Sequence, residues 1–226
     1  MNHELWRYEL RRIGWLALVG PPLALMGIGL LALVANQLGH ADQVARILTT
    51  SLDVLPLVGG VAAATAVSAD EALELQLSLP TTFRTTIIRR LALSLGWTGL
   101  LAFASTLALS VNGSLRGANS LLGDQLTWLA PLLWLVGVAT ALSLGLRAAV
   151  VGSGLIAVLW VVEQVLKDLF AAIPWLEPLW LFERWQPQQA MQWGFNRFVL
   201  LASAAALLGL AYWLLGRPER LLKGDN

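Results

Sequence analysis

The chain has 226 residues, of which 57% are hydrophobic and 13% charged, and its mean hydropathy is +0.68. Soluble globular domains carry about a quarter charged residues, so this composition excludes a water-soluble enzyme and predicts an integral membrane protein. The net charge of +1 gives no basic field that would attract nucleic acid, and the absence of cysteine excludes disulfides and thiolate chemistry.

Charged residues divide the sequence into apolar stretches, each long enough for a membrane-crossing helix of roughly 20 residues. The six expected spans are 13–35, 47–67, 91–111, 127–146, 148–166 and 198–216. The sequence shows no internal repeat and no interdomain linker, so we expect one all-α transmembrane domain over residues 1–226. Most of the 15 Lys and Arg residues fall at the termini and in the loops on the same side. The positive-inside rule therefore predicts that both termini are cytoplasmic.

The residues before the first span have a helical pattern of their own. Trp6, Leu10 and Ile13 recur at helical spacing between charged residues. We expect an amphipathic elbow helix over residues 1–12, lying on the cytoplasmic surface with its arginines against lipid phosphates. The alternative is that these residues are only the polar start of the first span.

The loop between the second and third spans predicts a helix over residues 68–80. Ser68 followed by Glu71 is a capping box, and the acidic side chains of Asp70, Glu71 and Glu74 suit the helix dipole at its start. Pro80 ends the helix. The inner leaflet is anionic, so an acidic helix start favours a protein partner over the alternative, a helix lying on lipid.

The segment between the fifth and sixth spans, residues 167–197, is too apolar for a solvated loop, and three prolines prevent a straight crossing. We expect two short helices that dip into the outer leaflet as a broken, re-entrant segment. A cap packed over the bundle is the alternative. Trp175 and Trp180 in this segment are candidate gate or pathway residues.

Two carboxylates, Asp53 and Glu163, lie inside expected spans, in the outer half at similar depth. Burying an acid in the membrane is costly, so both are candidate pathway residues that line a cavity or accept a cation or proton. The alternative is that they pair with Arg46 or Lys167 near the span ends.

Several of the 11 tryptophans fall near the ends of the expected spans. Among them are Trp15, Trp97, Trp128 and Trp193. We expect these side chains to be anchors at the membrane interface.

Together, the elbow, the six spans, the acidic helix and the broken segment resemble the ABC-transporter permeases of the ABC-2 (type V exporter) class. The sharpest local match is the acidic segment that ends at Pro80. There Asp70, Glu74, Leu79 and Pro80 match the family, while Glu71 replaces the glycine usual in it. Near the C-terminus, Trp193-x-x-Asn196-Arg197 is also similar to the family ending.

The resemblance implies that residues 68–80 are the coupling helix, which presses into a groove of a cytoplasmic ABC ATPase. The ATPase-coupling residues would be Asp70, Glu71, Glu74, Leu75, Leu79 and Pro80. ATP and Mg would bind the partner, and this chain would hold no cofactor and no metal. It contains no G-x-x-x-x-G-K-[ST] phosphate loop, so it is not expected to be an enzyme.

The function implied by the resemblance is that of the permease subunit of an ATP-driven exporter in a bacterial plasma membrane. A second permease, the same or a related chain, would complete a pathway for an amphipathic substrate, with membrane lipids as the other partner. The alternative is a non-transporting membrane anchor or assembly subunit of a multi-protein complex.

Overall fold

The computed structural model describes residues 15–68, 83–115, 121–146, 148–166, 173, 176–182 and 190–216. All regular elements in these ranges are helices, as the composition predicts, and no strand occurs among them. The expected elbow helix lies outside the described residues, as does the expected coupling helix apart from Ser68. The segment expected to re-enter the membrane is described in part.

The helical elements are α2 (Trp15–Gln37), α3 (Ala41–Thr49), α4 (Ser51–Ser68), α6 (Phe83–Val111), α7 (Leu121–Leu146), α8 (Ala149–Val165), the 3-10 helix η1 (Glu177–Leu179) and α10 (Ala190–Leu215). Five stretches are long and apolar enough to cross a membrane, with α3 and α4 taken together over Ala41–Val67. A sixth, α8, is apolar but has 17 residues. At 1.5 Å per residue it is about 25 Å long, slightly less than a hydrocarbon core of about 30 Å. The apolar helices therefore follow the predicted spans in order and are compatible with a multi-pass membrane protein.

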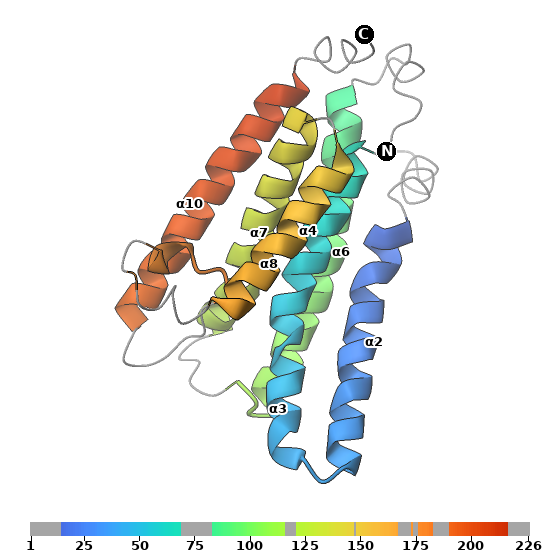
Figure 1. Ribbon diagram of the computed structural model, residues 1–226, viewed down its shortest axis with the longest axis vertical. Coiled ribbons are helices and arrows are strands. Elements are labelled where there is room, and N and C mark those ends of the chain that lie inside the picture. Colours follow the sequence, from blue (N-terminus) through green and yellow to red (C-terminus); the bar gives the residue numbers. More distant parts are fainter. Residues whose placement is uncertain are drawn as a thin grey trace.

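The helices form an elongated bundle in which successive spans run in alternating directions (Figure 1). At its centre, α4 packs against α2, α6, α7 and α8, while α10 packs chiefly against α7. The start of α2 and the end of α10 lie at the same end, which we call the proximal end. At the opposite, distal end, α8 finishes and α10 begins. The distribution of basic residues predicts that the proximal end faces the cytoplasm.

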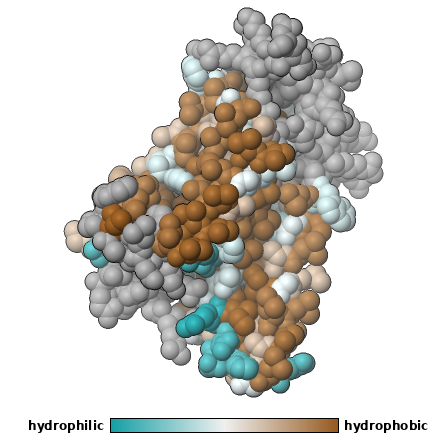
Figure 2. Space-filling view, in the orientation of Figure 1, coloured by the Kyte–Doolittle hydropathy of each residue, from teal (hydrophilic) through white to brown (hydrophobic). Residues whose placement is uncertain are grey.

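The visible surface of the bundle is largely apolar (Figure 2). Many of its exposed side chains are large aliphatic or aromatic groups on α2, α6, α8 and α10. Examples are Leu30 and Leu31 on α2, Val150 on α8 and Phe198 on α10. Soluble monomers rarely expose so much apolar surface, whereas helices in contact with lipid tails require it. The distribution of side chains therefore agrees with a bundle that faces lipid.

Glycines let the central helices approach closely. A Cβ atom at Gly60 of α4 would lie 3.1 Å from both the Leu135 Cβ of α7 and the Ile156 Cδ1 of α8. A Cβ atom at Gly137 of α7 would lie 3.0 Å from the Leu207 Cβ of α10. Small residues at helix crossings are typical of membrane bundles, where close backbone approach replaces hydrophobic burial as the source of stability. A side chain at either position would therefore push these helices apart.

Several helices begin earlier than the charge-free stretches predict. The structure places their starts at Ala41 instead of 47, Phe83 instead of 91, Leu121 instead of 127 and Ala190 instead of 198. The added turns of the last three contain charged residues that the bundle buries, namely Arg90, Asp124 and Arg197. A charge next to lipid is costly, but a charge that faces other helices is compensated by polar partners there. Charged residues thus limit the lipid-facing stretch without ending the helix.

Candidate functional site

The described part of the segment between α8 and α10 folds back against the bundle at the distal end. Its 3-10 helix η1 lies beside the start of α10 (Figure 1). The next residues, Leu181 and Phe182, are buried and belong to the same apolar core as Leu135 of α7 and Ile156 of α8. Residues 180–182, which we call the wedge, therefore form part of the core. This finding is compatible with the predicted re-entrant segment and equally with a cap packed over the bundle.

The wedge is held through its backbone by three side chains from two helices, which we call the clamp. From α8, Glu163 Oε1 accepts a hydrogen bond from the Leu181 N–H at 3.0 Å. From α10, Arg197 Nη1 donates to the Leu181 carbonyl at 2.7 Å, and Asn196 Nδ2 donates to the Trp180 carbonyl at 2.9 Å. Non-helical backbone at membrane depth must find such partners within the protein, because lipid offers none.

All three clamp side chains are buried. Glu163 is 5% exposed, while Asn196 and Arg197 are each 1% exposed. An isolated buried charge is very costly. A buried charged side chain therefore needs an opposite charge close to it. The Arg197 charge acts electrostatically on Glu163, as does the backbone amide of Phe182. The clamp therefore places an acid, a base and an amide side chain around one stretch of backbone.

Two further groups complete the surroundings of the clamp. The Arg197 guanidinium lies 5.2 Å from the ring centroid of Trp193, one turn earlier on α10, a distance typical of a cation–π contact. The Asp53 charge on α4 also acts on Glu163. The two candidate in-span carboxylates therefore lie within electrostatic range of each other.

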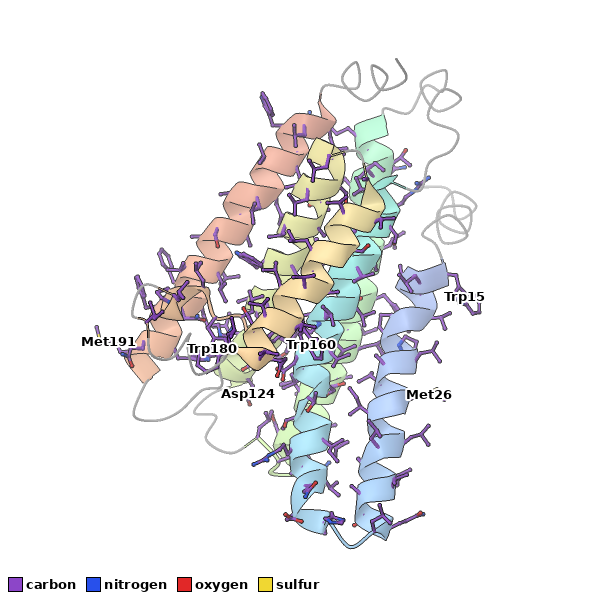
Figure 3. The ribbon with its side chains drawn as sticks, in the orientation of Figure 1. Trp15, Met26, Asp124, Trp160, Trp180 and Met191 are labelled. Carbon is purple, nitrogen blue, oxygen red and sulfur yellow. The ribbon has the colours of Figure 1, made fainter. Side chains whose placement is uncertain are left out.

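Of the other candidate site residues predicted from the sequence, the structure describes only some. Trp180 contributes its backbone carbonyl to the site and lies between α8 and α10 in Figure 3. Trp175 and the six expected ATPase-coupling residues lie outside the described residues, as does Lys167, one expected partner of the acids. Among the described basic residues, Arg197 is the one that acts on Glu163.

The charge-free stretches predict that Arg197 lies in a loop, and they give Asn196 no role beyond its match to the family ending. The sequence does contain a pattern that indicates this site, because Trp193, Asn196 and Arg197 stand at i, i+3 and i+4 and so share one helix face. It was missed because the last helix was expected to begin at residue 198. With α10 beginning at Ala190, this face lies within the helix and points into the bundle.

The tryptophans divide into two groups. Trp15 is exposed at the start of α2, as a membrane-interface anchor would be. Trp128 and Trp193 are buried in the bundle instead, and the Trp128 indole donates to Gln125 Oε1 at 2.8 Å. Of these three, Trp15 has the exposure that an interfacial anchor requires, whereas Trp128 and Trp193 pack inside the bundle.

At the proximal end, α6 and α10 are joined by a second polar contact. Arg84, in the first turn of α6, donates from Nη2 to the Tyr212 carbonyl of α10 at 3.1 Å. Its guanidinium also lies over the Tyr212 ring, 3.2 Å from the centroid. The start of α6, which follows the expected coupling helix in the chain, is thereby tied to α10.

Comparisons with protein-family models, with curated protein sequences and with solved structures found no match to this chain. Within the described residues, no group of three or more His, Asp and Glu side chains is arranged to hold a metal ion.

Proposed function

We propose that this chain is the membrane-spanning permease subunit of an ATP-driven exporter of the ABC-2 class. It would work in a bacterial plasma membrane with a second permease and a separate cytoplasmic ABC ATPase. The observation that carries the proposal is the buried clamp of Glu163 and Arg197 on a segment that returns into the bundle. Intramembrane charges mark functional positions by default, because a purely structural bundle is more stable with apolar residues there.

The proximal end supports the same proposal. The expected coupling helix connects the end of α4 at Ser68 to the start of α6 at Phe83. A push by an ATPase on this connection acts first on α4, which packs against α2, α6, α7 and α8. It acts also on Arg84, which is bonded to Tyr212 of α10. Since α10 carries Asn196 and Arg197, movement at the proximal end reaches the clamp through one continuous helix.

The proposal is tested by co-expressing the tagged chain with the genes that flank its own and identifying any ABC ATPase that co-purifies. The complex is purified in mild detergent, reconstituted in lipid nanodiscs, and its ATP hydrolysis is measured. The test variant carries Glu74→Arg and Leu79→Asp, two changes on the expected coupling helix. The control is Glu219→Arg, the same charge reversal in the C-terminal tail, which is expected on the same side of the membrane.

Loss of the ATPase from the Glu74→Arg, Leu79→Asp variant, with retention in the Glu219→Arg control, supports the permease proposal. Equal binding and equal hydrolysis in all three proteins contradicts it. If the chain purifies with other membrane proteins and without any nucleotide-binding subunit, the anchor or assembly role replaces it.

A further inference from the structure

One carboxylate oxygen of Glu163 has no hydrogen-bond donor. Its Oε1 atom accepts from the Leu181 N–H at 3.0 Å, whereas its Oε2 atom is buried and has no hydrogen-bond partner within the described residues. An ionised carboxylate accepts hydrogen bonds on both oxygens, and a buried acceptor without a donor costs free energy. The surroundings of Glu163 therefore satisfy its ionised form only in part.

A second carboxylate acts on Glu163 from a neighbouring helix. Asp53 lies in the first turn of α4, which packs against α8, and its charge acts on Glu163 together with the opposite charge of Arg197 on α10. The charged residue of α7 at this end, Asp124, accepts a hydrogen bond from Ser110 of α6 at 3.1 Å instead. With Glu163 ionised, the two acids and Arg197 carry one net negative charge, whereas with a proton on Glu163 they carry none.

A proton fits this site better than a metal ion does. The groups that act on the Glu163 carboxylate include the amides of Leu181 and Phe182 and the Arg197 guanidinium, and the positive ends of these donors repel a metal ion. Hard metal ions also need roughly six or more oxygen ligands, and no group of three or more acids and histidines is arranged to hold one in the described part of the chain. A proton needs a single lone pair, which Oε2 offers.

Access to the two acids differs between the ends of the bundle. On the proximal side, Ile156 lies two turns before Glu163 on α8, and both Ile156 and Leu135 of α7 are fully buried in the apolar core. On the distal side, Asp53 is only half-buried. Protons move through membrane proteins along polar side chains, and an apolar layer offers none. Exchange therefore takes place from the distal side, past Asp53.

We infer that Glu163 is a proton-binding site that exchanges its proton with the distal aqueous phase by way of Asp53. The ligand is the proton itself, so the chain senses the pH on the distal side of the membrane. This inference does not rest on the proposed exporter function, because every group in it belongs to this chain.

The site is tested by infrared spectroscopy of the full chain in dodecyl maltoside micelles, a detergent without carbonyl groups. A protonated carboxyl group has a C=O stretching band that a carboxylate lacks. Spectra are recorded from about pH 5 to about pH 9, where exposed acids stay ionised and buried ones titrate. The buffer cation is choline. The native protein should show a carboxylic acid band at the acidic end that disappears reversibly as the pH rises.

Three variants assign the band. Glu163→Gln keeps an oxygen that accepts from the Leu181 N–H and removes the proton site, so the band should be lost. Asp53→Asn removes a neighbouring negative charge, so the midpoint of the titration should fall by about one pH unit. The matched control is Asp124→Asn, which removes another buried carboxyl group and should leave the band and its midpoint unchanged.

A titrating band that is present in the native and Asp124→Asn proteins and lost in Glu163→Gln supports the proton site. The absence of any titrating band from the native protein overturns it, and that result needs no variant to fold. Persistence of the band in Glu163→Gln, or its loss in Asp124→Asn, also overturns it. Loss of the native band on addition of sodium or calcium ions at constant pH replaces the proton by a metal ion. An unchanged midpoint in Asp53→Asn contradicts the part given to Asp53.

Discussion

Trp97 of α6 donates its indole N–H to the Leu18 carbonyl of α2 at 2.9 Å. In a regular helix this carbonyl would accept from the N–H of residue 22, four positions later. Residue 22 is a proline, which has no N–H to donate. Because lipid offers no donor to the freed carbonyl, a side chain from the neighbouring helix must supply one. The Trp97–Leu18 hydrogen bond thus fastens α2 to α6 at a defect that the sequence of α2 itself creates.

We predict that Trp97→Phe lowers the free energy of unfolding by about 1–2 kcal/mol, because a freed carbonyl loses its donor. The measurement is denaturation by SDS in mixed micelles. In a Pro22→Ala background the helix supplies its own N–H to Leu18, so the same substitution should cost clearly less. Equal losses in the two backgrounds would show that Trp97 stabilises the bundle through packing alone.

A second prediction concerns the balance of charge in the clamp. Glu163→Leu alone leaves Arg197 buried without its acid, so we expect a loss of about 3–5 kcal/mol in the free energy of unfolding. Adding Arg197→Leu should restore most of that stability, since the buried guanidinium that lost its acid is then removed as well. A double-mutant cycle by SDS denaturation measures the coupling. Additive losses would mean that the two charges are compensated independently.

A third prediction tests the close packing of α4. Gly60→Ala should destabilise the protein by about 1–3 kcal/mol, because its Cβ would press on the Cβ of Leu135, which cannot move without α7. The control is Gly154→Ala in α8, where no atom lies within 4 Å of the added carbon. That change should leave the stability unchanged or raise it slightly, since alanine favours the helix by up to about 1 kcal/mol. Similar thermal unfolding midpoints for the two variants would contradict the packing argument.

A fourth prediction concerns the proximal link between α6 and α10. Arg84→Ala removes both the hydrogen bond to the Tyr212 carbonyl and the cation–π contact, so we expect a loss of about 1–2 kcal/mol in unfolding free energy. Arg89→Ala, on the same helix but exposed, is the control and should change the stability by less than about 0.5 kcal/mol. If both substitutions have the same effect, the contact between Arg84 and Tyr212 does not join the helices.

The sequence by itself determined the helical class of the chain and the order of its apolar helices. Length and hydropathy are properties of each stretch alone, and a run of roughly 20 apolar residues has one stable form in lipid, the helix. The same local reasoning identified Glu163 and Asp53 as notable, because an acid within an apolar stretch is visible without knowing its neighbours.

Only the tertiary structure decided which groups meet. Glu163 and Arg197 are brought together through Leu181, and Trp97 finds the Leu18 carbonyl from another helix. These partners are far apart in the sequence, and no periodic pattern connects them. The early start of α10, which turns Asn196 and Arg197 inward, was likewise invisible to a rule based on charge. Hydropathy measures the cost of a side chain in lipid, whereas inside a bundle that cost depends on the polar partners that folding supplies.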